Sequence, residues 1–109
     1  MERLFVYGTL APNRPNEHIL KDLVGTWEYS TVKGRLYQEG WGAQMGYPGV
    51  ILDNEGQTIQ GSIFSSPELS KKWEFLDDFE GEEYERVLVK AKLLTGEFVD
   101  AFIYALKKQ

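Results

Sequence analysis

The acidic residues near position 80 have the type and spacing needed to transfer protons. Seven of the 17 Asp and Glu residues lie between Glu74 and Glu85. At about 100° per residue along a helix, Glu80 lies about 20° from Leu69, whereas Asp78 lies about 180° from it. If residues 69–80 form a helix with Leu69 on its buried side, Glu80 is the acid that this helix directs toward the core, and Asp78 is expected in solvent.

Three effects are expected to raise the pKa of a carboxyl group at position 80. Burial removes water from the ionised form, neighbouring carboxylates repel it, and the negative end of the helix dipole disfavours a second negative charge. A glutamate that faces a pocket with a pKa near neutrality can serve as a general acid and base. The alternative is that the last helical turn frays and Glu80 points to solvent, as acid-rich segments usually do.

A second candidate site follows the apolar run Leu4-Phe5-Val6, where the chain continues as Tyr7-Gly8-Thr9-Leu10. Gly8 permits a tight turn in which successive backbone N–H groups point the same way, and such a nest binds a carboxylate or stabilises an oxyanion. The segment has neither the glycine pattern of a dinucleotide site nor the Lys-Ser/Thr pair of a phosphate loop. An ordinary turn is the alternative interpretation.

Helix and strand signals place these two candidates in a common fold. Ser66 as N-cap, Pro67 at the first helical position and Gly81 at the end predict a helix over 66–81. Its apolar face comprises Leu69, Trp73 and Leu76. A shorter helix is expected after Asn16, with Ile19, Leu20 and Leu23 as its apolar residues.

The remaining segments predict strands at 4–7, 27–37, 50–52, 58–64, 87–93 and 98–104. Residues 53–56 are typical of a hairpin turn, Thr95-Gly96 of another turn, and Gly34 of a bulge or a close backbone approach. This order favours an α+β fold with a small mixed, mainly antiparallel sheet and two short helices over a doubly wound parallel sheet. Closure of the sheet into a barrel is one form that this arrangement can take.

Composition excludes several classes of function. The 109 residues fit a single domain spanning 1–109, and they include no cysteine and only one histidine, His18. Disulfide scaffolds, thiolate or histidine-built metal sites and cysteine nucleophiles are thereby excluded. A net charge of -5 disfavours nucleic acid as a partner. The longest apolar run, Ala101–Leu106, is too short to span a membrane, and Met1-Glu2-Arg3 begins no signal peptide, so a cytoplasmic protein is expected.

Three segments together resemble the gamma-glutamylcyclotransferase-like family, in particular its small bacterial members and the gamma-glutamylamine cyclotransferases. They are residues 4–10 (LFVYGTL) with Asn16, residues 75–80 (FLDDFE) followed by Tyr84 and Arg86, and residues 101–104 (AFIY). Tyr47-Pro48 and the strand containing Gly61 agree as well. The resemblance therefore extends over almost the whole chain.

This resemblance implies a compact barrel-like fold that cyclises a gamma-glutamyl group to 5-oxoproline without a metal or other cofactor. The catalytic glutamate of the family falls on Glu80, and the loop that holds the glutamyl end of the substrate falls on Tyr7, Gly8, Thr9 and Leu10. Family members often carry a basic residue and then glycine after this loop, whereas this chain has Ala11 and Asn13.

Further substrate-binding candidates are Tyr84, Tyr104 and Pro48. For the two tyrosines, core packing with a hydrated hydroxyl is an equally good interpretation. Arg86 is expected to form an ion pair with Asp77, Glu82 or another nearby acid rather than to bind a substrate carboxylate. The predicted protein is a monomer acting on a small gamma-glutamyl substrate. The alternative function is a non-catalytic binding or regulatory protein that keeps the cleft of the family.

Overall fold

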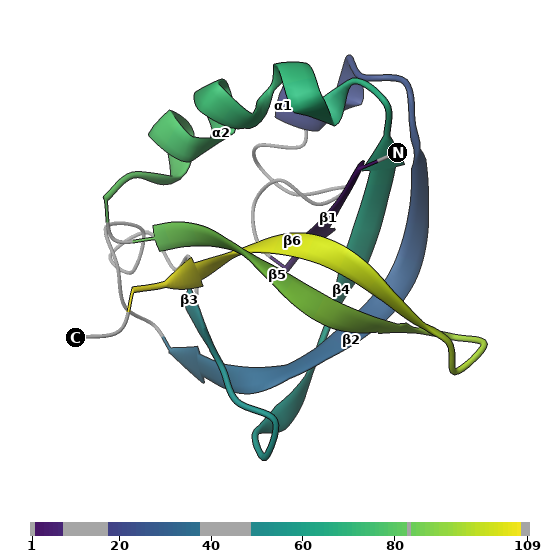
Figure 1. Cartoon of the computed structure of the whole chain (residues 1–109), viewed down its shortest axis with the longest axis vertical. Coiled ribbons are helices and arrows are strands. Elements are labelled where there is room, and N and C mark those ends of the chain that lie inside the picture. The colour runs from purple at the N-terminus through teal and green to yellow at the C-terminus, as the bar shows by residue number, and fades with distance from the viewer. Residues whose placement is uncertain (1, 8–17, 38–48, 83, 108–109) are drawn as a thin grey trace.

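A closed, mixed β-barrel is the main feature of the computed structural model, which describes residues 2–7, 18–37, 49–82 and 84–107 (Figure 1). The strands are β1 (Glu2–Val6), β2 (Thr26–Tyr37), β3 (Gly49–Leu52), β4 (Gln57–Ser66), β5 (Tyr84–Leu93) and β6 (Phe98–Leu106). They form one six-stranded sheet in the order β3-β2-β4-β1-β6-β5, and β2 also pairs with β5. Five strands thus form a closed ring, with β3 attached to β2. The predicted barrel-like α+β fold is confirmed.

The sheet is mixed because β1 lies antiparallel to β4 and parallel to β6. The ring closes where Ser30 and Thr31 of β2 pair with Leu93 and Lys92 of β5. Ser30 is fully buried at this junction, and its hydroxyl donates a hydrogen bond of 2.8 Å to the backbone oxygen of Lys92. In the closed ring, the short strand β1 lies between two longer strands, β4 and β6, and pairs with both.

Two short helices, α1 (His18–Lys21) and α2 (Trp73–Glu80), lie over one end of the barrel (Figure 1). The prediction of one helix over 66–81 is wrong in its first half, because Ser66 is still the last residue of β4 and pairs with Glu2 of β1. A 3-10 turn, Leu69–Lys71, follows, and α2 begins only after Lys72. The Ser66 hydroxyl accepts a hydrogen bond of 3.0 Å from the Glu68 amide, which stabilises the connection between β4 and this 3-10 turn.

Side-chain alternation along the strands divides the core into two clusters. In β1, Leu4 and Val6 face the helices, whereas Phe5 faces the interior of the barrel. The predicted apolar face of the second helix is confirmed, since its three residues are buried in the cluster below the helices. That cluster contains Leu4, Val6, Leu20, Phe64, Leu69, Trp73, Leu76, Tyr84, Tyr104 and Leu106.

The turn at residues 53–56 is present, but the predicted hairpin around it is wrong. The Gly56 amide donates to the Asp53 carbonyl at 2.8 Å, yet β3 and β4 both pair with β2 rather than with each other. Gly34 of β2 stands opposite Leu52 in one pairing and Gln57 in the other. A Cβ at Gly34 would lie 2.8 Å from the Ile51 carbonyl oxygen, so the expected close backbone approach is confirmed.

The described parts of the chain contain no helix that is both long enough and apolar enough to cross a membrane.

Candidate active site

Glu80 is the last residue of α2, and the backbone immediately after it has a conformation that favours glycine. Gly81 has φ 89° and ψ −177°, a region that side chains with a Cβ rarely occupy. Its amide donates to the Asp77 carbonyl at 3.1 Å and closes the last turn. The sequence therefore ends α2 at Gly81 as predicted, and the chain turns back toward the barrel directly after Glu80.

The Glu80 carboxyl group is half-buried, and Asp78 is exposed, as the helical spacing predicts. Trp73, which is buried, lies seven residues before Glu80 in the same helix, which corresponds to about 20° around the axis. The break at Lys72 therefore leaves the predicted orientation unchanged. Burial alone raises the pKa of Glu80, from an ordinary value of 4.5 to about 7. At neutral pH the carboxyl group is therefore divided between its acid and base forms.

Tyrosines from two strand ends lie within electrostatic range of Glu80. Burial, together with the charge on Glu80, raises the pKa of Tyr7, and the nearby Tyr84 contributes to the same shift. The pKa of Tyr104 is also raised, first by burial, then by its hydrogen bond to Asp77 and to a smaller extent by Glu80. Both hydroxyls therefore stay protonated at neutral pH.

The Tyr7 hydroxyl connects three strands at this end of the barrel. It donates to the backbone oxygen of Tyr104 at 2.6 Å and accepts a hydrogen bond from the Val50 amide at 3.2 Å. A phenol has one proton to donate, so the Tyr7 hydroxyl has none left for a substrate. The Tyr7 hydroxyl thus links the end of β1 to β6 and to the start of β3.

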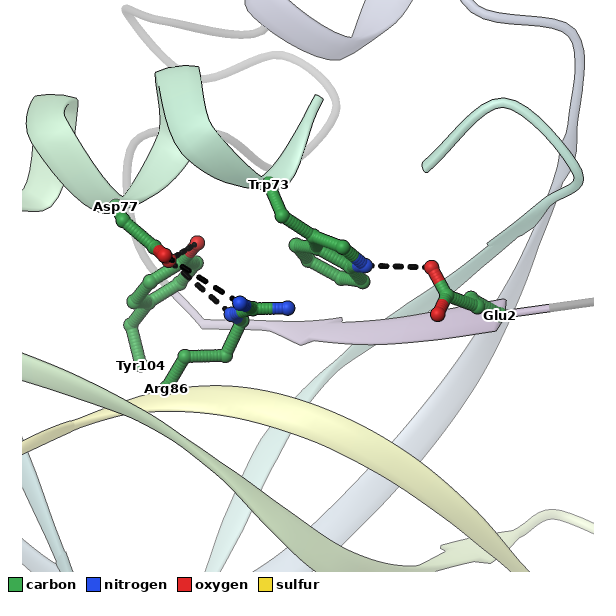
Figure 2. Close-up of polar contacts among 5 residues, drawn as sticks. All are labelled: Glu2, Trp73, Asp77, Arg86 and Tyr104. Carbon is green, nitrogen blue, oxygen red and sulfur yellow. Dashed lines mark hydrogen bonds and ion pairs between the residues drawn. The ribbon is translucent and has the colours of Figure 1, made fainter. Parts of the chain in front are cut away.

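Asp77 and Arg86 form the main polar network beneath α2 (Figure 2). The Tyr104 hydroxyl donates to Asp77 Oδ1 at 2.7 Å, and Arg86 Nε lies 3.1 Å from the same oxygen. The expected ion pair of Arg86 with Asp77 is therefore confirmed. Because the hydroxyl proton of Tyr104 is used within the protein, Tyr104 also has no proton to donate to a substrate.

The structure brings together four of the predicted site residues: Tyr7, Glu80, Tyr84 and Tyr104. Gly8, Thr9, Leu10 and Pro48 lie outside the described residues, as does Asn16. Their assignment to the substrate-binding site remains a prediction from the sequence. Among the residues that the structure describes, no group of three His, Cys, Asp or Glu side chains is placed to hold a metal ion.

Sequence reasoning missed the contact of Asp77 with Tyr104, because it selected one inward-facing acid in the helix. Residues three apart share a side of a helix, and Asp77 lies three positions before Glu80. That spacing is the signal that would have identified a pair of acids directed toward the barrel. The bond from Trp73 Nε1 to the Glu2 carboxylate was also missed, since it joins residues 71 positions apart.

The raised pKa of Glu80 makes protein stability depend on pH in a defined direction. Below about pH 4.5, Glu80 is protonated in both the folded and the unfolded chain. As pH rises from there through about 7, the unfolded chain ionises freely while the folded chain must ionise a buried group, so stability is lost.

We expect Glu80→Gln to become more stable relative to wild type across this window, measured by urea denaturation at a series of pH values. Glu82→Gln, at an exposed glutamate, is the control. Parallel profiles for wild type and Glu80→Gln would contradict the burial of the carboxyl group.

A family model described as gamma-glutamyl cyclotransferase, AIG2-like, matches residues 4–109 of the chain. The chain belongs to this family. The resemblance that the sequence motifs indicated is therefore confirmed, and the family match covers both Glu80 and the polar network beneath α2.

Individual proteins that this chain resembles agree with this assignment. The human protein gamma-glutamylaminecyclotransferase is 29% identical over 107 aligned positions, which cover 86% of this chain and 64% of the human protein. The crystal structure of an AIG2-like protein from Mus musculus has a TM-score of 0.81 at 26% identity and covers 100% of this chain and 79% of the mouse chain. The crystal structure of YkqA from Bacillus subtilis has a TM-score of 0.74 at 29% identity, covering 97% of this chain and 36% of that chain. This chain thus spans about two thirds or less of the length of two of these relatives.

Proposed function

We propose that this protein cyclises the gamma-glutamyl group of a gamma-glutamylamine or a gamma-glutamyl amino acid to 5-oxoproline and releases the amine. The observation that carries the proposal is the half-buried carboxyl group of Glu80, whose pKa burial raises to about 7. Membership of the family and the name of the human relative, which gives a gamma-glutamylamine as substrate, support the same reaction.

In the proposed reaction, the α-amine of the substrate attacks the γ-carbonyl carbon of the same molecule. A new C–N bond closes the five-membered ring, and the original amide C–N bond breaks. Glu80 takes a proton from the attacking amine as general base and returns a proton to the departing amine as general acid, so that protons balance. Acid and base forms are both populated near neutrality, which suits a group that must act in both directions.

Because the attack is intramolecular, the protein mainly has to hold the substrate in its cyclising conformation. We assign this role to the segment Tyr7-Gly8-Thr9-Leu10, whose backbone N–H groups would bind the α-carboxylate or the developing oxyanion. The hydrogen bonds of Tyr7 to Tyr104 and Val50 support the assignment, since they fix the strand end from which this segment departs.

The proposal is tested by measuring 5-oxoproline release from a panel of gamma-glutamyl amino acids and gamma-glutamyl-lysine. We expect release from at least one member of the panel, with one amine produced for each 5-oxoproline. No release from any member, combined with measurable binding of 5-oxoproline by calorimetry, would instead support a binding protein that retains the cleft of the family.

A further inference from the structure

We infer that Asp77 is a positioning residue for Glu80, because through Arg86 and Tyr104 it holds the last turn of α2 on strands β5 and β6. The inference rests on the proposed function, in which the Glu80 carboxyl group exchanges protons with the substrate. It assigns a role to a carboxylate that itself takes no part in the proposed chemistry.

Asp77 uses both of its carboxylate oxygens to contact two strands. Oδ1 accepts a hydrogen bond of 2.7 Å from the Tyr104 hydroxyl of β6 and lies 3.1 Å from Arg86 Nε of β5. Oδ2 lies 3.4 Å from a terminal guanidinium nitrogen of the same arginine. A carboxylate held at both oxygens has a fixed orientation, which a single exposed ion pair does not provide.

The arginine is fixed in turn by two aromatic rings, of which that of Trp73 is drawn in Figure 2. The Arg86 guanidinium carbon lies 4.5 Å from the centre of the Trp73 ring and 5.2 Å from the centre of the Phe102 ring. Trp73, the first residue of α2, donates its indole N–H to the carboxylate of Glu2 in β1. Side-chain contacts therefore hold both the first and the last turn of the helix on the barrel.

Glu80 depends on this anchorage because it stands at the end of a short helix. The final carbonyl groups of a helix have no intrahelical partners, and the last turn therefore opens most readily. Asp77 lies one turn before Glu80, and its backbone carbonyl also accepts the Gly81 amide. The Asp77 and Arg86 side chains are 44% and 26% exposed, so their ion pair contributes little to overall stability, and its loss should affect orientation more than folding.

By holding the last turn of α2 on the barrel, the same network also maintains the burial of the Glu80 carboxyl group. Tyr7 and Tyr104 lie within electrostatic range of Glu80, with Tyr84 next to Tyr7, and Tyr104 is in range of both members of the ion pair. Replacing Asp77 by asparagine removes a negative charge and leaves Arg86 without its counterion. Because burial is what raises the pKa of Glu80, a last turn of α2 that Asp77 no longer holds should admit water to the carboxyl group, and its pKa should fall toward the ordinary value.

The test compares Asp77→Asn with Asp78→Asn, which makes the same change one residue away at an exposed position. With gamma-glutamyl-lysine as substrate, we expect Asp77→Asn to lower kcat by about 10- to 100-fold with little change in KM, because the bound substrate meets a misplaced acid. We also expect its Glu80 carboxyl group to titrate at lower pH by carbon-13 NMR. Asp78→Asn should match wild type in both measurements.

Arg86→Lys is the second variant, used in case Asp77→Asn fails to fold. Lysine keeps the positive charge but loses the planar, forked contact with the carboxylate and the two rings, so a smaller loss of kcat is expected. Wild-type kcat and an unchanged Glu80 titration in both variants would overturn the inference. If wild type cyclises nothing in the panel, the proposed function fails, while the NMR comparison still decides whether Asp77 controls Glu80.

Discussion

Replacing Glu80 by glutamine is expected to lower kcat for 5-oxoproline release by about 10²- to 10⁴-fold, the range typical for loss of a general acid and base. Glutamine has nearly the same size and can stay in the same half-buried position, but it can neither accept the proton of the attacking amine nor supply one to the leaving amine. KM should change little, because the substrate is held mainly by other groups. The measurement is a steady-state assay of 5-oxoproline on the best substrate of the panel.

Glu82→Gln is the matched control for this variant, since it makes the same chemical change at an exposed glutamate two residues away. It should retain the wild-type rate. A Glu80→Gln variant that also retains the wild-type rate would show that Glu80 takes no part in the reaction. In that case α2 would supply no catalytic residue, and membership of the family would not imply a reaction at this helix.

The second large effect concerns the packing that holds α2 on the barrel. Leu76 is 0% exposed, whereas the adjacent Phe75, about 100° away around the helix axis, is 51% exposed. We expect Leu76→Ala to lower the free energy of unfolding by about 2–5 kcal/mol, because it leaves a cavity in the cluster that also contains Trp73.

Phe75→Ala is the control, and its effect should be well below that of Leu76→Ala, as is usual for surface positions. Both values are obtained from urea denaturation at one pH. Equal losses of stability in the two variants would contradict the orientation of α2, and with it the inward direction of Glu80.

Helical periodicity predicted the inward direction of Glu80 because the three residues that define the face, Leu69, Trp73 and Leu76, are all buried. The predicted direction of Glu80 does not depend on where the helix begins, because Trp73 and Glu80 both lie in α2. The start of the helix could not be predicted from the residues near it in the sequence. Ser66 has the type of a helix cap, but its pairing with Glu2 in β1, a contact far away in the sequence, keeps it in a strand.

The failed hairpin at residues 53–56 has a similar cause. The turn residues were recognised correctly, but a turn does not determine which strands pair on either side of it. The two flanking strands, β3 and β4, both pair with β2, which is long enough to pair with each of them along a different part of its length. The link from Tyr7 to Val50 and the network around Asp77 likewise depend on how the ring of strands closes, which a single sequence does not reveal.

The most direct test of the account is the titration of the Glu80 carboxyl group by carbon-13 NMR in the wild-type protein, alongside the pH dependence of kcat/KM. We predict an NMR midpoint near 7, coinciding with a rise in kcat/KM as the group ionises. A midpoint near 4.5, the ordinary value for a glutamate, would contradict both the burial of this carboxyl group and its role as the acid and base of the reaction.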